Sequence, residues 1–161
     1  MKKYILIFIS LFMIGACKSQ KKISNSEQNQ HSAIAISQPK IIFTLATTAC
    51  YGTCPVFEMS VFENDSLVYN GENYVKVKGQ ISKKLAKGTV EKLQKQFRNA
   101  NFFELKNVYE MNVSDLPTTY ISFTDNEKTK KIKDYAGSPE TLKQLEALLR
   151  ALVEEEVILQ R

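Results

Sequence analysis

β-branched, aromatic and alternating residues predict six β-strands after residue 39. The alternation is easiest to follow in PVFEMSVFE, where Phe57, Met59 and Val61 fall on one face. Glu63–Ser66 follow with residues that favour a turn, so we expect the next strand to pair back as a hairpin. The expected strands are residues 40–47, 55–63, 67–71, 73–79, 118–125 and 128–135.

Two other stretches have a helical period. Val90, Leu93 and Phe97 are spaced three and four residues apart, which predicts a helix over residues 87–99 with Thr89 as its N-cap. Phe102 and Phe103 follow this helix, and we expect them to close the end of the core.

The second predicted helix has the clearer pattern. It begins with Ser138 as N-cap and Pro139 at the first helical position, where both residue types are favoured. We expect its apolar stripe to pack on the protein's own sheet rather than on a partner helix. The stripe consists of Leu142, Leu145, Leu149 and Leu152.

This order of elements predicts the α+β class. We expect an antiparallel sheet with two helices packed on one face, the simplest two-layer arrangement. Residues 104–117 have no clean period and predict an ordered loop, while residues 154–161 are ambiguous. Residues 40–161 have the length of one ordinary domain.

The first 39 residues differ from the rest. Lys2 and Lys3 precede the apolar run Tyr4–Ile14, which is shorter than the roughly 20 residues that cross a bilayer and is typical of a signal peptide. The residues IGAC resemble a bacterial lipobox, and that resemblance implies cleavage before Cys17 and acylation of Cys17. Residues 18–39 are polar and lack aromatics, which predicts a flexible tether.

We therefore expect three parts: a lipoprotein signal peptide at 1–16, the lipidated Cys17 with its tether at 17–39, and a single domain at 40–161. The location would be the cell envelope, with attachment to the outer membrane through Cys17. Removal of the leader lowers the basic count from 22 to 20 against 17 acidic residues, a net charge of about +3. This mild charge and the compartment argue against nucleic acid as a partner, and we expect an envelope protein or ligand. The single histidine, His31, lies in the tether, where we expect it to be solvated.

Cys50 and Cys54 are the two cysteines that remain after Cys17. Disulfides persist outside the cytoplasm. Four residues of extended strand span about 13 Å, whereas a disulfide needs Cα atoms about 4.4–6.8 Å apart, so the chain must fold back at Gly52. We favour a structural disulfide. Thiol redox and Cu(I) binding remain alternatives, although redox sites normally have Cys-x-x-Cys opening a helix.

Three motifs together resemble a known bacterial family. They are Cys-Tyr-Gly-x-Cys-Pro at residues 50–55, the Phe102–Phe103 pair, and Asp-x-Pro at residues 115–117. The chain resembles the domain-of-unknown-function 6438 family over roughly residues 40–152, although that family often has a glycine where residues 64–66 read Asn-Asp-Ser. The resemblance implies a fold and a lipoprotein or secreted location, and it brings no activity.

Candidate catalytic chemistry is sparse. Glu110 lies in the irregular loop and Asp134 ends a strand, but no histidine after His31 completes a nucleophile–base set. We therefore predict a non-enzymatic domain with no catalytic residue, metal or cofactor.

Loops on a rigid scaffold commonly carry binding function. The expected contact surfaces are the loop with Tyr51 and Gly52, shaped by the cysteine pair, and the irregular loop with Tyr109, Asp115 and Pro117. The predicted function is binding or scaffolding, and inhibition of a secreted protease is an alternative of the same kind.

Overall fold

A computed structural model describes residues 38–159 of the chain. These residues belong to one compact unit, Ser37–Arg161. The expected signal peptide, Cys17, His31 and nearly all of the expected tether lie outside the described residues. Within the described part, no helix is both long and apolar enough to cross a membrane.

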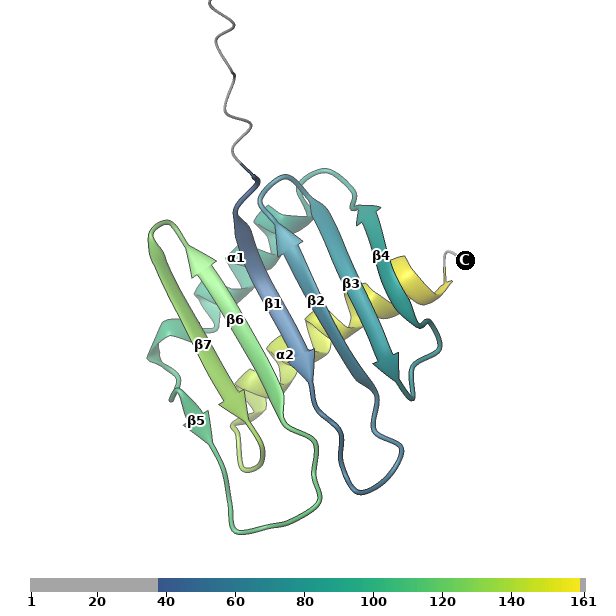
Figure 1. Cartoon of the computed structure of the whole chain (residues 1–161). Helices are drawn as coiled ribbons and strands as arrows, with labels where there is room; N and C mark the ends of the chain where they lie inside the picture. Colours follow the sequence, from purple (N-terminus) through teal and green to yellow (C-terminus); the bar gives the residue numbers. More distant parts are fainter. Residues whose placement is uncertain (1–37, 160–161) are drawn as a thin grey trace, which may run out of the picture. The chain divides into compact units, whose positions relative to one another are not determined.

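The described residues form a seven-stranded sheet with the order β4-β3-β2-β1-β6-β7-β5 (Figure 1). Neighbouring strands are antiparallel except β5, which runs parallel to β7. The strands are β1 (Ile41–Thr47), β2 (Val56–Phe62), β3 (Ser66–Asn73), β4 (Gly79–Lys84), β5 (Val108–Tyr109), β6 (Thr119–Asp125) and β7 (Lys128–Asp134).

The α+β class is confirmed, but the expectation of a purely antiparallel sheet is wrong. Strand β5 arises from the segment that the sequence predicts as loop. It forms because backbone N–H groups of β7 and the residue after it find acceptors there: Lys133 donates to Asn107 at 2.9 Å and Tyr135 donates to Tyr109 at 2.9 Å. The lysine-rich strand β7 is therefore partly covered at its edge.

The strand predicted at residues 73–79 is also wrong. These residues form the connection between β3 and β4, in which Tyr74 has a φ of 53° and Gly79 a φ of 82°. The Tyr69 hydroxyl crosses this connection and donates to the Val77 carbonyl at 3.2 Å. It passes so close to Gly71 that a Cβ there would lie 2.6 Å from the hydroxyl. The fourth strand therefore begins only at Gly79.

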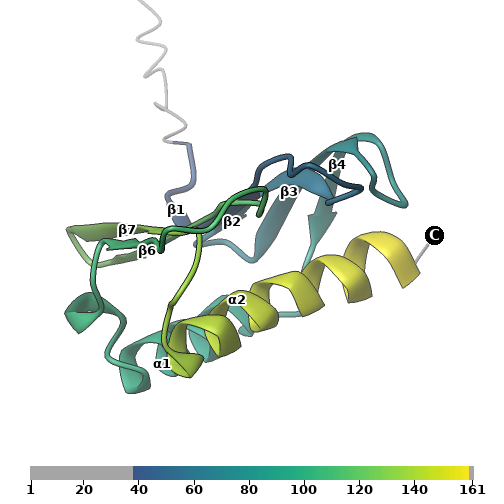
Figure 2. The same ribbon diagram turned by 90° about the horizontal axis from the view of Figure 1, so that it is seen from below.

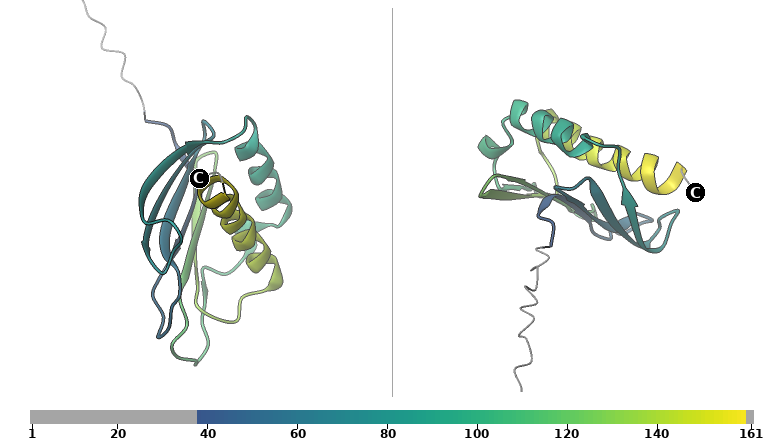
Figure 3. Two further views of the ribbon diagram at one scale, coloured as in Figure 1. Left: turned by 90° about the vertical axis from the view of Figure 1, so that its right-hand side faces the viewer. Right: turned by 90° about the horizontal axis from the view of Figure 1, so that it is seen from above.

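Both α-helices lie on the same side of the sheet (Figure 2; Figure 3). They are α1 (Thr89–Asn99) and α2 (Glu140–Val153), and a 3₁₀ turn, η1 (Phe102–Glu104), follows α1. Beyond α2 the chain continues as a π-helical segment, η2 (Glu154–Leu159). Residues 154–159 of the ambiguous C-terminal segment therefore extend the helical rod by more than a turn.

Four phenylalanines tie the two layers together. The ring of Phe43 on β1 lies 5.0 Å from that of Phe123 on β6 and 4.7 Å from that of Phe97 on α1. Phe102 on η1 lies 5.3 Å from Phe97. All four are fully buried, so aromatic packing adds to the hydrophobic contribution at the centre of the core.

The cap predicted for the first helix is wrong. Thr89 is the first helical residue, and its hydroxyl donates to the Ala86 carbonyl. The orphan N–H groups at the helix start bind instead to Asp65, in the β2–β3 turn. Its two carboxylate oxygens accept from Gly88 at 3.0 Å and from Val90 at 2.9 Å. These bonds lower the pKa of Asp65, with the bond from Val90 as the largest cause.

Ser138 is not the cap of α2 either. Pro139 occupies the N-cap position with extended backbone, and the helix begins at Glu140. The Ser138 hydroxyl points back to the end of β7, where it donates to Asp134 at 2.6 Å. The Ser138 hydroxyl therefore bonds to a carboxylate at the end of β7 and not, as the local pattern predicts, to the first turn of α2.

Candidate functional site

Cys50 and Cys54 form the expected disulfide, with their Cα atoms 5.7 Å apart. The chain folds back between them, and the Gly52 N–H lies 3.3 Å from the Cys50 sulfur. Tyr51 extends into solvent from this loop and is 91% exposed. Strand β2 begins two residues after Cys54, so the segment that follows the second cysteine is extended and not helical.

The two loops expected as separate contact surfaces lie against each other. Residues 48–55 and 110–118 leave the same end of the sheet (Figure 1), because β1 and β6 are neighbours. Thr48 donates its N–H to the Thr118 carbonyl at 3.0 Å, and its hydroxyl accepts the Thr118 N–H at 2.9 Å. Tyr51 donates its N–H to the Asp115 carbonyl at 3.5 Å.

The remaining predicted residues support this surface in different ways. Asp115 is exposed and has a φ of 69°, so it shapes the bend of its loop. Tyr109 is half-buried, and its hydroxyl accepts the Lys106 N–H at 2.9 Å. Pro117 is half-buried beside the start of β6. Tyr135, which directly follows β7, supports the loop by donating its hydroxyl hydrogen to the Val113 carbonyl at 3.0 Å.

Apolar side chains gather on the paired loops. Seven large hydrophobic side chains are exposed within residues 38–159, and four of them lie here. We call these four the loop patch: Tyr51 (91% exposed), Met111 (60%), Val113 (44%) and Leu116 (46%). Because the two loops adjoin each other, their exposed apolar side chains are candidates for an interaction surface.

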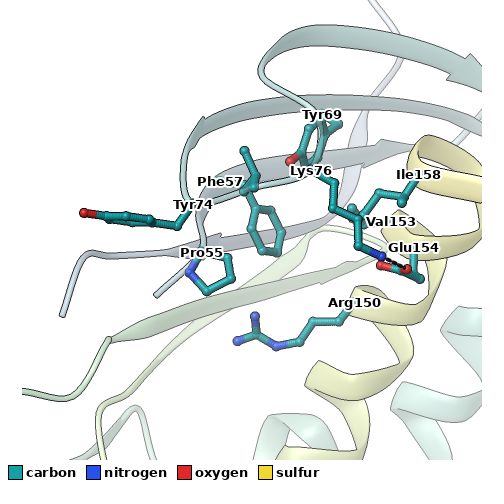
Figure 4. Close-up of a pocket in the computed structure, with 10 residues that line it drawn as sticks. Pro55, Phe57, Tyr69, Tyr74, Lys76, Arg150, Val153, Glu154 and Ile158 are labelled. Atoms are coloured by element: carbon teal, nitrogen blue, oxygen red, sulfur yellow. Dashed lines mark hydrogen bonds and ion pairs between the residues drawn. The ribbon is translucent and has the colours of Figure 1, made fainter. Parts of the chain in front are cut away.

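A pocket of about 300 Å³ lies at the base of the disulfide loop (Figure 4). It is bounded by the sheet on one side and by α2 and η2 on the other. Apolar and aromatic side chains line most of it: Pro55, Phe57, Tyr69, Val75, Val153 and Ile158. Pro55 directly follows Cys54, so the pocket and the disulfide loop share one segment of chain.

Thr47 holds the segment that leads from the disulfide loop into β2 and lines this pocket with Pro55 and Phe57. Its buried hydroxyl donates to the Pro55 carbonyl at 2.7 Å and accepts the Phe57 N–H at 3.2 Å. The register of β2 against β3 shifts between Val56 and Phe57. Tyr74 stands at the pocket's rim and extends outward, 60% exposed and with its backbone in the left-handed region (Figure 4).

Three charged residues complete the pocket. Lys76 and Glu154 pair across its outer edge at 2.7 Å. Arg150 reaches from α2 to a position beside Phe57 and Pro55 (Figure 4), with its guanidinium carbon 5.9 Å from the Phe57 ring centroid. Its Nη2 donates to the Thr119 hydroxyl at 2.8 Å.

A buried carboxyl group lies behind Arg150. Glu146 is only 8% exposed, and its Oε2 lies 3.7 Å from the Arg150 Nη2. Its Oε1 is buried and receives no hydrogen bond from the described residues. Burial raises the pKa of Glu146 to about 7, and the nearby Asp134 carboxylate adds to this shift while Arg150 opposes it.

The sequence carried a signal for Glu146 that we did not use. It follows Leu142 by four residues and precedes Leu149 by three, so it falls inside the apolar stripe of α2. An acidic residue on a buried helical face is a candidate for a shifted pKa. Asp134 is a carboxylate at a strand end in the sequence pattern, but only the tertiary fold brings it near Glu146 on α2.

The copper alternative would draw on thioether ligands, for which the sequence offers Met59 and Met111 after the cysteine pair. Their positions give it no support. Met59 is fully buried in the core and Met111 lies on the exposed loop. Within residues 38–159, no cluster of three or more histidine, cysteine, aspartate and glutamate side chains is placed to hold a metal ion.

Comparison with known proteins gives one result. The family model described as a domain of unknown function (DUF6438) matches residues 41–153. Comparison with curated proteins finds no match.

Proposed function

Because this chain belongs to the family described as a domain of unknown function (DUF6438), its membership assigns no activity, and we propose a function from its own residues. We propose that the protein is a non-enzymatic binding domain of the cell envelope. Acylated Cys17 would hold it on the outer membrane, and the loop patch would contact an envelope protein. The observation that carries this proposal is the position of the loop patch on two loops braced against each other.

The bracing favours binding because it lowers the entropic cost of forming a complex. The disulfide, the two bonds between Thr48 and Thr118, and the support from Tyr135 all restrict the loops before a partner arrives. Tyr51 adds a large exposed side chain at the tip. Tyrosine is among the residues that dominate the binding energy of protein interfaces.

The placement of the patch agrees with an N-terminal anchor. The chain enters the described unit at the start of β1, and the loops that carry the loop patch lie beyond the far end of that strand (Figure 1). A strand of seven residues spans roughly 20 Å. Attachment through the preceding residues would therefore leave the loop patch open to a partner.

A binding role also suits the chemistry of the cysteine pair. A strand follows Cys54, whereas thiol–disulfide enzymes place their reactive cysteine at a helix N-terminus to lower its pKa. We therefore propose that the disulfide has a structural role, which is to hold the shape of the loop between Cys50 and Cys54. A secreted-protease inhibitor would use the same surface, and the identity of the captured partner distinguishes the two.

Site-specific photocrosslinking in cells tests the proposal. A photoreactive phenylalanine analogue at position 116 should capture a discrete protein species. The matched control places the same analogue at Glu127, an exposed position in the β6–β7 turn, away from the loop patch. The crosslink should appear from position 116 and not from position 127. It should weaken at least several-fold when Val113→Asp introduces a charge into the patch.

Equal crosslinking from both positions would show that the patch has no special role. The absence of any crosslinked species from positions 51, 111 and 116 alike would overturn the proposal. A captured partner that Val113→Asp does not affect would place the interface elsewhere on the domain.

A further inference from the structure

We propose that the pocket at the base of the disulfide loop binds a small carboxylic acid with an apolar body, whose carboxylate pairs with Arg150. This goes beyond the proposed function, because the loop patch faces solvent at the tip of the loops and contributes no residue to the pocket. The two sites can therefore be tested separately.

The pocket provides an apolar wall for the body of such a ligand. Phe57 presents its ring beside the guanidinium (Figure 4), while Val153 and Ile158 come from the helical side. Val75 closes the wall from the β3–β4 connection. Small-molecule sites typically combine walls of this kind with a few polar groups that fix the ligand's orientation.

The charges select an anion. Lys76 and Glu154 lie 2.7 Å apart and neutralise each other at the outer edge. Arg150 therefore leaves the pocket lining with one excess positive charge. Outside this lining, the Glu146 Oε2 lies 3.7 Å from the Arg150 Nη2, within ion-pair range but beyond hydrogen-bond length. Burial raises the pKa of Glu146 to about 7, so this carboxyl group neutralises Arg150 only in part near neutral pH.

Arg150 is also oriented to receive a ligand. A guanidinium has five N–H donors in a fixed planar fork. One N–H of Arg150 is bonded to the Thr119 hydroxyl, which holds the fork beside Phe57 and Pro55. No hydrogen bond from its Nε or Nη1 to another residue of 38–159 is present in the structure. The second N–H of Nη2, together with the adjacent N–H of Nε or Nη1, matches a carboxylate in a bidentate pair.

The size of the pocket limits the ligand class. A volume of about 300 Å³ is at the lower end of ligand sites, which range over about 300–1,000 Å³. It suits a free acid with one ring or a short chain. We therefore commit to a small aryl- or alkyl-carboxylic acid as the occupant.

A titration with a charged and a neutral probe tests this inference. The full chain, held in lipid nanodiscs, is titrated with 3-phenylpropionate and with its uncharged isostere 3-phenylpropionamide, and binding is followed by ligand-observed NMR. Empty nanodiscs correct for partitioning into lipid. The acid should bind saturably and at least tenfold more tightly than the amide.

Three variants locate the interaction. Arg150→Gln should weaken binding of the acid about tenfold while leaving the amide unchanged, and Arg150→Lys should retain part of the difference. Lys143→Gln removes one positive charge from an exposed position of the same helix and should change neither affinity. Thermal unfolding of each variant establishes that it is folded.

Equal affinities for acid and amide would overturn the inference, as would saturable binding of the acid that folded Arg150→Gln and Arg150→Lys both leave unchanged. Absence of saturable binding by the acid to the folded wild-type chain would overturn it as well. None of these results bears on the loop patch, since crosslinking from position 116 does not involve the pocket.

Discussion

Glu146 is a carboxyl group that folding transfers from water to the interface between α2 and the sheet. Its pKa rises from 4.5 to about 7, so the folded state holds a proton between these values that the unfolded state has released. The free energy of unfolding therefore falls as pH rises. The contribution from protonated Glu146 is complete below about pH 4.5 and is lost as pH rises through 7. The shift corresponds to on the order of 3 kcal/mol.

We predict that Glu146→Gln removes the part of the pH dependence of stability that Glu146 causes, because the amide stays neutral. Denaturant unfolding of wild type at pH 5 and pH 8 should show a lower free energy of unfolding at pH 8, and the variant should lose less. Glu127→Gln, at an exposed turn position, is the matched control and should behave as wild type does. A wild-type stability that rises from pH 5 to pH 8, with the same rise in Glu146→Gln, would contradict this prediction.

At the scale of elements, α1 depends on a residue that lies outside it. Asp65 binds the N–H groups of Gly88 and Val90 while its own backbone adopts a φ of 57°. The first hairpin and the first helix are thus joined by one side chain. Loss of a capping carboxylate typically costs about 0.5–2 kcal/mol.

We therefore predict that Asp65→Ala lowers the free energy of unfolding by about 1–2 kcal/mol in urea denaturation. Asp65→Asn should lose less, since asparagine tolerates the left-handed backbone and keeps one acceptor oxygen. Thr89→Ala, which removes the cap expected from the sequence, should change stability by less than about 0.5 kcal/mol. A larger loss from Thr89→Ala than from Asp65→Ala would favour the local cap instead.

The sequence predicted the elements that depend on local pattern and missed those that depend on tertiary contacts. Strands β1, β2, β6 and β7 were predicted to within about one residue at each end, because their alternation is a local property. Strand β5 was missed because two residues pair with β7 only once the tertiary fold brings them there. Strand β4 was misplaced because the turn at Tyr74 is set by contacts of Tyr69 and Gly71.

The candidate sites divide in the same way. The cysteine count and the expected compartment were enough to predict the disulfide, and the bond requires the fold-back of the loop that carries Tyr51. The contact between that loop and residues 110–118 required knowing that β1 and β6 are neighbours. The pocket was not predicted, since its lining comes from separate segments of the chain. Arg150 lies between Leu149 and Leu152 of the apolar stripe of α2 without belonging to it.

At the scale of the whole molecule, the described domain has two unlike ends. One receives the chain at the start of β1, and the other carries the loop patch and, at its base, the pocket. An anchor on the preceding residues would separate attachment from recognition, so that a partner and the membrane need not compete for the same surface. This arrangement gives the proposed lipid anchor a testable consequence.

We predict that Cys17 is the acylated residue and that the two other cysteines take no part in membrane attachment. Cells grown with labelled palmitate should incorporate the label into wild type and into Cys50→Ser, whose thiol chemistry is altered but whose anchor is intact. Cys17→Ser should incorporate none and should shift from lipid-modified to unmodified mass. Stable anchoring requires about two acyl chains. Protein that carries no acyl chain should therefore be extracted from membranes by salt, whereas the acylated wild type should stay bound. Labelling that persists in Cys17→Ser would refute the anchor, and the loop patch would then have to act in a protein held in the envelope by other means.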